Sequence, residues 1–306
     1  MLWFWISLAA FFFLALSAVV DKFLLTKTRL RALSFAFFIS LGGAVLSLVL
    51  LFAKINLQLL PAFWLPLLIG GGALFFSLYF MFLAVEKGEV SKVNPLIVSL
   101  TPAFVFLMSF FTGLELITGK RLFGVLLIVL AGYFLARAGV KKTRLHYQAW
   151  IFVLLSALFF GLANVFSKIV YDGLPFFEAF FGLRWMCLIV AIVFVICFNK
   201  LHDIREIFKH QKSDNGSTMK KAVLVMIIGQ TTGVLGVVLQ QYAIKLGNVI
   251  LVTALNGTQF FFLLLLVLIL AKFFPSILQE DVSRNSMLKK LLWSAILFIG
   301  VALVII

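Results

Sequence analysis

The chain alternates between long apolar runs and short polar connectors along its whole length. Each run approaches the ~20 residues that a helix needs to cross about 30 Å of hydrocarbon. The runs do not alternate apolar with polar residues, so the pattern favours helices over the strands of a membrane barrel. The pattern therefore predicts ten membrane-spanning helices at approximately 2–20, 32–53, 61–84, 95–114, 121–137, 149–170, 176–198, 221–243, 248–271 and 288–306.

Two pairs of segments relate the first half of the chain to the second. Residues 69–88 align without gaps on residues 228–247 at an offset of 159, and residues 15–22 align on residues 161–168 at an offset of 146. Because five spans are an odd number, consecutive five-helix repeats enter the membrane in opposite directions. We therefore expect an all-α membrane protein of two inverted five-helix repeats around a central cavity, an architecture typical of alternating-access transporters. The repeats would cover residues 1–143 and 144–306.

The composition strengthens the membrane interpretation. Of the 306 residues, 64% are hydrophobic and 12% are charged, whereas a soluble domain is usually about half apolar and a quarter charged. The N-terminal run lacks a basic leader and a small-residue cleavage site before Asp21, so we expect it to be a retained first helix.

The net charge of +15 raises the question of a nucleic-acid partner. The cations, however, stand in short clusters between the apolar runs, where lipid headgroups explain them better. The eleven acids all fall at span ends or in connectors, so the sequence offers no mid-span carboxylate for a proton-coupled cation pump. A neutral or zwitterionic solute suits this chain better.

The sequence does not indicate an enzyme, a metal or a cofactor. Cys187 and Cys197 lie in one apolar run and the three histidines lie in connectors, without the spacing of a metal site. There is no Ser/His/Asp set and no glycine-rich phosphate loop. Transport would therefore depend on gradients or exchange.

The segment 82–136 resembles the second part of an EamA-type repeat in the drug/metabolite transporter superfamily. It has a short polar elbow, a span with a central proline at Pro102, Glu115 just past that span, and a last span that contains Gly124 and Gly132. The resemblance implies ten helices, a plasma (inner) membrane location and export or exchange of small metabolites such as amino acids.

The second half resembles the family pattern more loosely. Phe261 replaces the proline, and Arg184 corresponds to the family's intramembrane arginine. The family also places both termini in the cytoplasm. The charges favour the opposite orientation. The odd-numbered connectors between the predicted spans hold 20 Lys and Arg residues and the even-numbered connectors hold 5, and the connectors richer in Lys and Arg usually face the cytoplasm.

The candidate site rests on polar residues inside the spans. Gln230 and Gln241 are eleven residues apart and share a helix face, and an unpartnered amide in hydrocarbon costs several kcal/mol. The amides therefore line a solute pathway or bond a neighbouring helix, while the adjacent glycines serve packing. The residues expected to bind substrate are Gln230, Gln241, Asn256, Gln259, Asn164, Arg184, Ser99 and Tyr79.

Three of the polar positions have structural alternatives. Arg184 would hold an anionic group such as a substrate carboxylate, or else pair with Glu178 or with helix-end carbonyls. Thr101 is expected to bond its own helix. Pro102 would free the carbonyl of residue 98 and kink its helix.

These patterns favour a secondary transporter of small metabolites, an exporter that works by alternating access in the plasma (inner) membrane. The expected partners are a small-molecule substrate and the lipid bilayer, and the expected state is a monomer, with a dimer as the alternative. The alternative function is a non-transporting scaffold or receptor-like protein whose polar residues serve helix packing. A lipid-acting enzyme would need an acid- or histidine-bearing cluster at headgroup level, which the sequence does not offer.

Overall fold

The computed structural model describes residues 2–25, 32–53, 55–88, 90–114, 118–137, 146–200, 216–273 and 284–305. Within these ranges the chain forms helices and no strand. The expected all-helical class is therefore confirmed for the part of the chain that the structure describes.

The helices overlap every apolar run that the sequence singles out. In chain order they are α1 (Leu2–Leu25), α2 (Ala32–Ser47), the 3₁₀ helices η1 (Leu48–Ala53) and η2 (Leu57–Phe63), α3 (Trp64–Lys87), α4 (Val90–Thr112), α5 (Gly119–Arg137), α6 (Tyr147–Gly173), α7 (Phe176–Cys197), α9 (Gly216–Leu246), α10 (Val249–Leu255), α11 (Thr258–Phe273) and α12 (Arg284–Ile305).

Five of the described segments are long and apolar enough to cross a membrane. They are Ala32–Phe52, Leu57–Lys87, Val93–Thr112, Tyr147–Gly173 and Phe176–Cys197. Many large apolar side chains on their outer faces are exposed, among them Phe52, Phe110 and Ile196. This distribution fits an all-helical membrane protein, in which lipid covers the outer surface.

The range 248–271 is not one continuous helix. Asn248 starts α10, because its side-chain oxygen accepts the backbone N–H groups of Ile250 and Leu251 at 3.0 Å. At the other end, the N–H of Asn256 donates to the Thr253 carbonyl and the N–H of Gly257 to the Ala254 carbonyl, each at 3.2 Å. These hydrogen bonds span three residues, as in a 3₁₀ turn. They end α10 at Leu255, and α11 begins at Thr258.

Close packing against α12 accounts for the glycine at this break. A Cβ on Gly257 would lie 2.7 Å from a Leu297 methyl carbon, so a larger residue does not fit without a shift. Asn and Gly are also weak helix formers. The break therefore reflects both two weak helix formers and the approach of Leu297 from α12.

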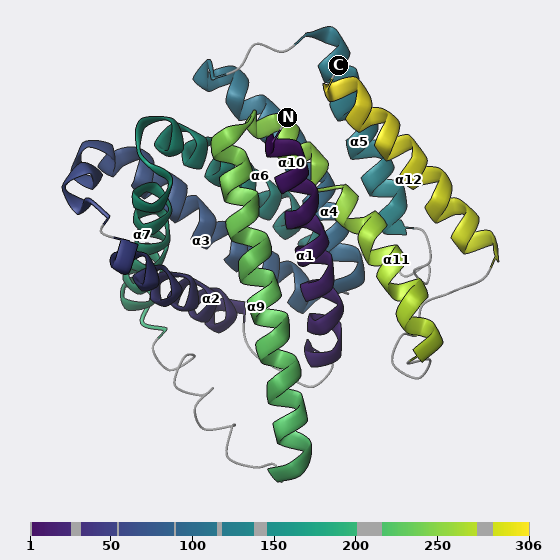
Figure 1. The fold of residues 1–306 in the computed structure, drawn as a ribbon, viewed down its shortest axis with the longest axis horizontal. Helices are drawn as coiled ribbons and strands as arrows, with labels where there is room; N and C mark the ends of the chain where they lie inside the picture. Colours follow the sequence, from purple (N-terminus) through teal and green to yellow (C-terminus); the bar gives the residue numbers. More distant parts are fainter. Residues whose placement is uncertain are drawn as a thin grey trace.

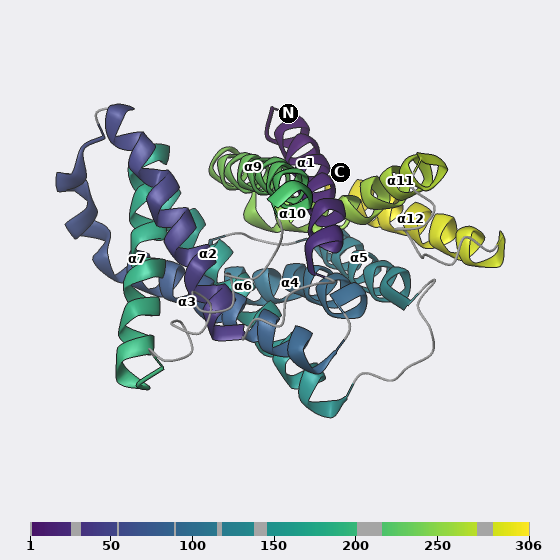
Figure 2. The same ribbon diagram turned by 90° about the horizontal axis from the view of Figure 1, so that it is seen from below.

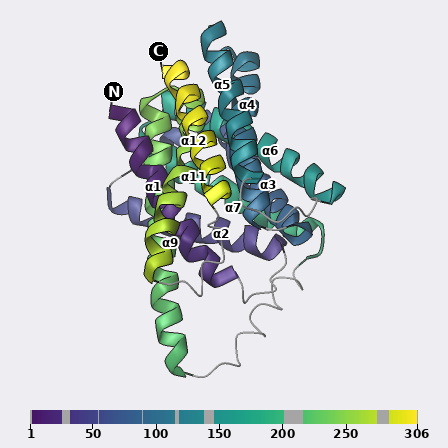
Figure 3. The ribbon, with the colours of Figure 1, turned by 90° about the vertical axis from the view of Figure 1, so that its right-hand side faces the viewer.

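The helices pack in pairs that join distant parts of the chain. α3 lies along α6, α1 along α9, and α5 along α12, and the last two pairs are visible in Figure 1. Figure 2 shows α2, α3 and α7 on one side of the molecule and α11 and α12 on the other. The start of α1 and the end of α12 lie at the same end of the bundle, and the first turns of α9 extend beyond the other helices at the opposite end (Figure 3).

Candidate functional site

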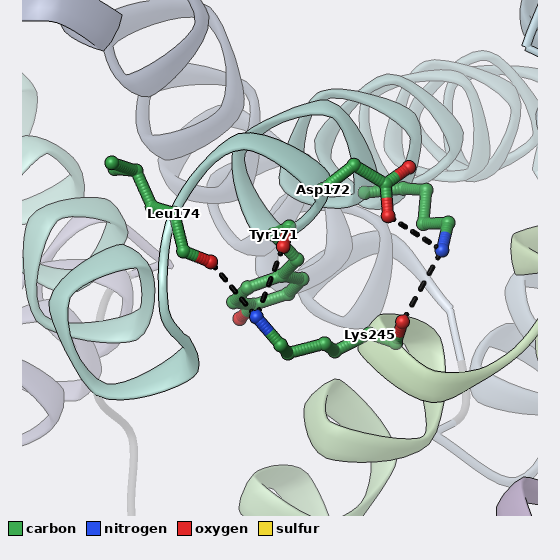
Figure 4. A network of polar contacts seen from close by, with 5 residues as sticks. Tyr171, Asp172, Leu174 and Lys245 are labelled. Carbon is green, nitrogen blue, oxygen red and sulfur yellow. Dashed lines mark hydrogen bonds and ion pairs between the residues drawn. The ribbon is translucent and has the colours of Figure 1, made fainter.

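The C-terminal ends of α6 and α9 meet through two lysines, one from each helix (Figure 4). Lys245 of α9 donates through Nζ to the carbonyls of Leu174 at 2.8 Å and Tyr171 at 3.1 Å, at the end of α6. Lys168 of α6 donates through Nζ to the carbonyl of Lys245 at 3.3 Å. Since the last carbonyls of a helix lack intrahelical donors, each helix supplies a cation to the end of the other.

An ion pair orients one of these lysines. Lys168 Nζ lies 2.8 Å from Asp172 Oδ1, one turn further along α6. Asp172 is exposed, and an i,i+4 pair of this kind contributes only about 0.3–0.5 kcal/mol. The pair therefore holds Lys168 toward α9 more than it stabilises the fold.

A buried phenol joins the same two helices. The hydroxyl of Tyr171 donates to Oε1 of Gln241 at 3.1 Å, and only 2% of the Tyr171 side chain is exposed. Leaving a buried hydroxyl without a partner would cost about 1–3 kcal/mol. Gln241, a predicted site residue, thus bonds a neighbouring helix in this structure, as one of the two sequence-based interpretations of the amides allowed.

Aromatic rings continue the contact from α6 to α7. The ring of Phe176 lies 5.4 Å from Tyr171, 5.0 Å from Tyr242 and 5.7 Å from Phe180, measured between centroids. The guanidinium carbon of Arg184 lies 4.9 Å from the Phe180 centroid, within the range of a cation–π contact. We call the residues Lys168, Tyr171, Asp172, Phe176, Phe180, Arg184, Gln241, Tyr242 and Lys245 the α6–α7–α9 junction.

Arg184 does not pair with the acid that the sequence suggested. Glu178 accepts the backbone N–H of Asn56 at 3.2 Å. On its other side, Arg184 lies against α2, where a Cβ on Gly43 would be 3.3 Å from the Arg184 Cδ. Among the described residues, the structure records no ion pair and no hydrogen bond for this guanidinium.

Asn164 lies on the same helix as the junction. It is seven residues before Tyr171, which places both on one face of α6 two turns apart, and it is buried. The sequence therefore contained a signal for Tyr171: it extends a polar face that begins at Asn164 and includes Ser167.

Two hydroxyls on α4 bond their own helix. Ser99 donates to the Leu96 carbonyl at 3.0 Å. Its Cβ packs against Gly132 of α5, where an added side chain would overlap it. Thr101 donates to the Ile97 carbonyl at 2.8 Å, so the expected back-bond is confirmed. Ser99 thus lies at the contact between α4 and α5, away from the junction.

Three further predicted residues lie elsewhere in the fold. Asn256 ends α10, and its Oδ1 is buried without a hydrogen-bond partner among the described residues; Gln259 is half-buried in the first turn of α11. Tyr79 of α3 stacks on Phe75, with centroids 6.3 Å apart, and lies 5.4 Å from Phe194 of α7. The structure does not bring these three residues to the junction.

The remaining predictions concern α9 and α4. Gln230 lies in α9, but its side chain is outside the described part. A Cβ on Gly233 would lie 2.7 Å from Ser17 Oγ, and one on Gly236 would lie 3.0 Å from the Ala10 carbonyl. The expected packing role of these two glycines is confirmed. Pro102 is buried, and α4 continues through it.

The junction combines a guanidinium, two ammonium groups, an amide, a phenol and apolar rings. Within the described residues, no group of three or more His, Cys, Asp or Glu side chains comes together. The groups at the junction can recognise charge and hydrogen-bonding atoms and can hold helix ends together. Glu115 lies outside the described residues.

No protein-family model matches the chain, and no curated protein matches it. A solved structure described only as "Crystal structure of protein" has the same fold, with a TM-score of 0.67 and 18% sequence identity. The match covers 98% of this chain and 95% of that chain. At this identity the similarity shows a shared fold and nothing about activity.

Proposed function

We propose that this chain is a secondary transporter that exports small neutral or zwitterionic metabolites across the plasma (inner) membrane by alternating access. Its fold would be ten spans arranged as two inverted five-helix repeats, as in EamA-type transporters of the drug/metabolite transporter superfamily.

The helix pairs support a two-fold relation between the halves. The offset of 159 relates α3 to α9, and the offset of 146 relates α1 to α6. α3 packs on α6 and α1 packs on α9, so the third helix of each half lies on the first helix of the other. α4 likewise packs on α6 as α11 packs on α1.

One pair of contacts carries the proposal at the level of single residues. Ser156 of α6 donates through Oγ to the Ser77 carbonyl of α3 at 2.9 Å. The two offsets relate Ser77 to Gly236 and Ala10 to Ser156. Gly236 and Ala10 meet in turn where α9 crosses α1. The same two positions of the repeat therefore meet at both crossings, although the offsets come from the sequence alone.

The two related helix crossings, α3 with α6 and α1 with α9, would allow the halves to exchange an open and a closed arrangement. An inverted pair can interchange the arrangements of its halves, which opens one side of the membrane while closing the other. The two ends differ in chemistry, because Glu86 occupies the position in the first half that Lys245 occupies in the second. Glu86 accepts the backbone N–H of Ala32 at the start of α2. The lysine bonds of α6 and α9 would hold the second end closed.

Flux through purified protein in proteoliposomes tests the proposal. We expect saturable uptake or counterflow of at least one solute from a broad panel of labelled neutral and zwitterionic metabolites. The double variant Gln230→Leu, Gln241→Leu should lose this flux and remain folded in detergent, whereas Gln148→Leu, at an exposed amide that starts α6, should keep it. Absence of flux for every solute would favour the non-transporting scaffold.

The sidedness of the chain has its own test. The charge distribution places the connector between α7 and α9 in the cytoplasm, whereas the family expectation places it outside. A cysteine introduced at Ser213, in that connector, should resist a membrane-impermeant thiol reagent in intact cells when Cys197 is first replaced by Ser. Labelling from outside would contradict the charge-based orientation.

A further inference from the structure

Arg184 lies farther from the ends of its helix than Lys168 of α6, which is five residues before Gly173. It lies in α7, eight residues after Phe176, inside a segment long and apolar enough to cross a membrane. A charged side chain within such a segment is costly unless it meets water, protein acceptors or an opposite charge. Its surroundings therefore show what could compensate the charge.

The immediate neighbours of the guanidinium are apolar. Its carbon lies 4.9 Å from the Phe180 ring centroid. On the α2 side, the position of a Cβ on Gly43 would be 3.3 Å from Cδ and 3.7 Å from one terminal nitrogen of Arg184. Because glycine has no side chain, α2 comes close without covering the charge. Neither neighbour has a polar side chain to offer to the N–H groups.

The carboxylates recorded near α6 and α7 are engaged elsewhere. Glu178 accepts from Asn56, and Asp172 pairs with Lys168. Among the described residues, no acid and no carbonyl is recorded as a partner of Arg184. The side chain is also only half-buried, so an anion can approach it.

Two neutral polar groups, the phenol of Tyr171 and the thiol of Cys187, lie near Arg184. The phenol donates to Gln241, and the thiol lies 3.3 Å from Ser40 Oγ of α2. A guanidinium carries one positive charge, and its planar fork matches the two oxygens of a carboxylate.

We propose that Arg184 binds the carboxylate of the transported solute, between α2 and α7 and next to the Tyr171–Gln241 hydrogen bond. This inference rests on the proposed transport function. It narrows the zwitterionic substrates to those with a carboxylate and adds monocarboxylate anions to the expected substrates. Solutes that carry only an amine or an amide fall outside the class.

Matched ligands test the inference on the full chain in nanodiscs. The probes are the twenty common L-amino acids, lactate and pyruvate, each compared with its amide, and sodium chloride as an anion control. We expect at least one carboxylate to raise the melting temperature and to bind about 10- to 100-fold more tightly than its amide, the range for a charged hydrogen-bonded contact. Equal binding of acid and amide, or stabilisation by chloride alone, would overturn the inference.

Variants show whether Arg184 is the residue that binds. Arg184→Gln should weaken carboxylate binding about 10- to 100-fold and leave amide binding unchanged, and Arg184→Lys should restore part of it. Arg121→Gln, at the start of α5, removes the same charge elsewhere and should have no effect. If Arg184→Gln does not fold, Arg184→Lys provides a second route, because it keeps the charge and loses the planar fork, so it should bind the carboxylate more weakly than the unchanged protein.

The outcomes separate this inference from the function on which it rests. A purely structural arginine would lower the melting temperature of Arg184→Gln and leave its carboxylate affinity intact, which overturns the inference. Flux of amides and acids at equal rates overturns the inference and leaves transport standing. Arginine-dependent carboxylate binding without any flux supports the site and removes the transport function.

Discussion

The glycine run at residues 70–72 of α3 allows a quantitative test of close packing. A Cβ on Gly71 would lie 2.7 Å from the backbone nitrogen of Cys187 and 2.9 Å from the Leu183 carbonyl, both on α7. A Cβ on Gly72 would find its nearest neighbour, a Val190 methyl carbon, at 3.5 Å, which is ordinary contact. One added methyl group therefore meets backbone at the first position and makes an ordinary contact at the second.

The expected difference between Gly71→Ala and Gly72→Ala follows from these distances. Both variants gain about 1 kcal/mol of helix propensity, so that gain cancels when the two are compared. Overpacking costs about 1–3 kcal/mol and applies to Gly71 alone. We expect Gly71→Ala to be less stable than Gly72→Ala by about 1–3 kcal/mol. This corresponds to roughly 2–6 °C in melting temperature for a chain of this size.

Thermal unfolding of the purified protein in detergent, followed by tryptophan fluorescence, measures this difference. Gly72→Ala should melt at or slightly above the temperature of the unchanged protein. Equal melting temperatures for the two variants would refute the packing argument. A loss of flux in both variants without a change in stability would instead show that the run serves flexibility.

Three further predictions concern contacts between helices. Tyr171→Phe removes the donor to Gln241 and should destabilise the protein by about 1 kcal/mol; an unchanged melting temperature would show that the bond contributes nothing. Lys245→Met removes two bonds to the end of α6 and should accelerate amide hydrogen exchange at residues 171–174, whereas unchanged exchange would contradict a closing role for the lysine. Ser156→Ala should destabilise the protein by less than about 1 kcal/mol, because Ala10 occupies the related position where α1 crosses α9. A cost above about 2 kcal/mol in the same melting assay would weaken the proposed equivalence of the two crossings.

The positions of the helices were predictable because membrane spans leave a strong signal. A run of ~20 apolar residues has few other uses, and each predicted run overlaps a described helix. The break at Asn256 and Gly257 was not predicted, since its cause includes the approach of Leu297 from α12. Hydrophobicity averaged over a span does not report a contact of this kind.

The candidate site was predictable only in part. Polarity inside an apolar run identified Gln241 and Arg184, and both lie at the α6–α7–α9 junction. Lys168 and Lys245 lie near the ends of predicted spans, where a lysine in the sequence is typical of a cation at the membrane surface. Their bonds join the end of one helix to a side chain of another, and one sequence does not show which helix ends meet.

In the proposed repeat, the fourth helix of each half has a weak point at related positions. Pro102 has no N–H, so the carbonyl of Val98 in α4 lacks its helical donor, although α4 continues through the proline. The offset of 159 relates Val98 to Gly257, which lies in the break between α10 and α11. Phe261, the residue related to Pro102, keeps its N–H but falls in the first turn of a new helix. The first half therefore loses one helical hydrogen bond where the second half breaks into two helices.

Proline substitution in α11 tests this relation. The Gly257 carbonyl at the start of α11 accepts from the Phe260 N–H, and no bond from the Phe261 N–H to this carbonyl is recorded among the described residues. Phe261→Pro should therefore lose mainly the side-chain contacts of Phe261, including the edge contact with Phe298. Phe262→Pro removes the helical bond to the Thr258 carbonyl and should cost about 3 kcal/mol more. Chemical unfolding in detergent measures both variants. Equal destabilisation would show that α10 and α11 run as one helix and that the two halves do not share a weak point at these positions.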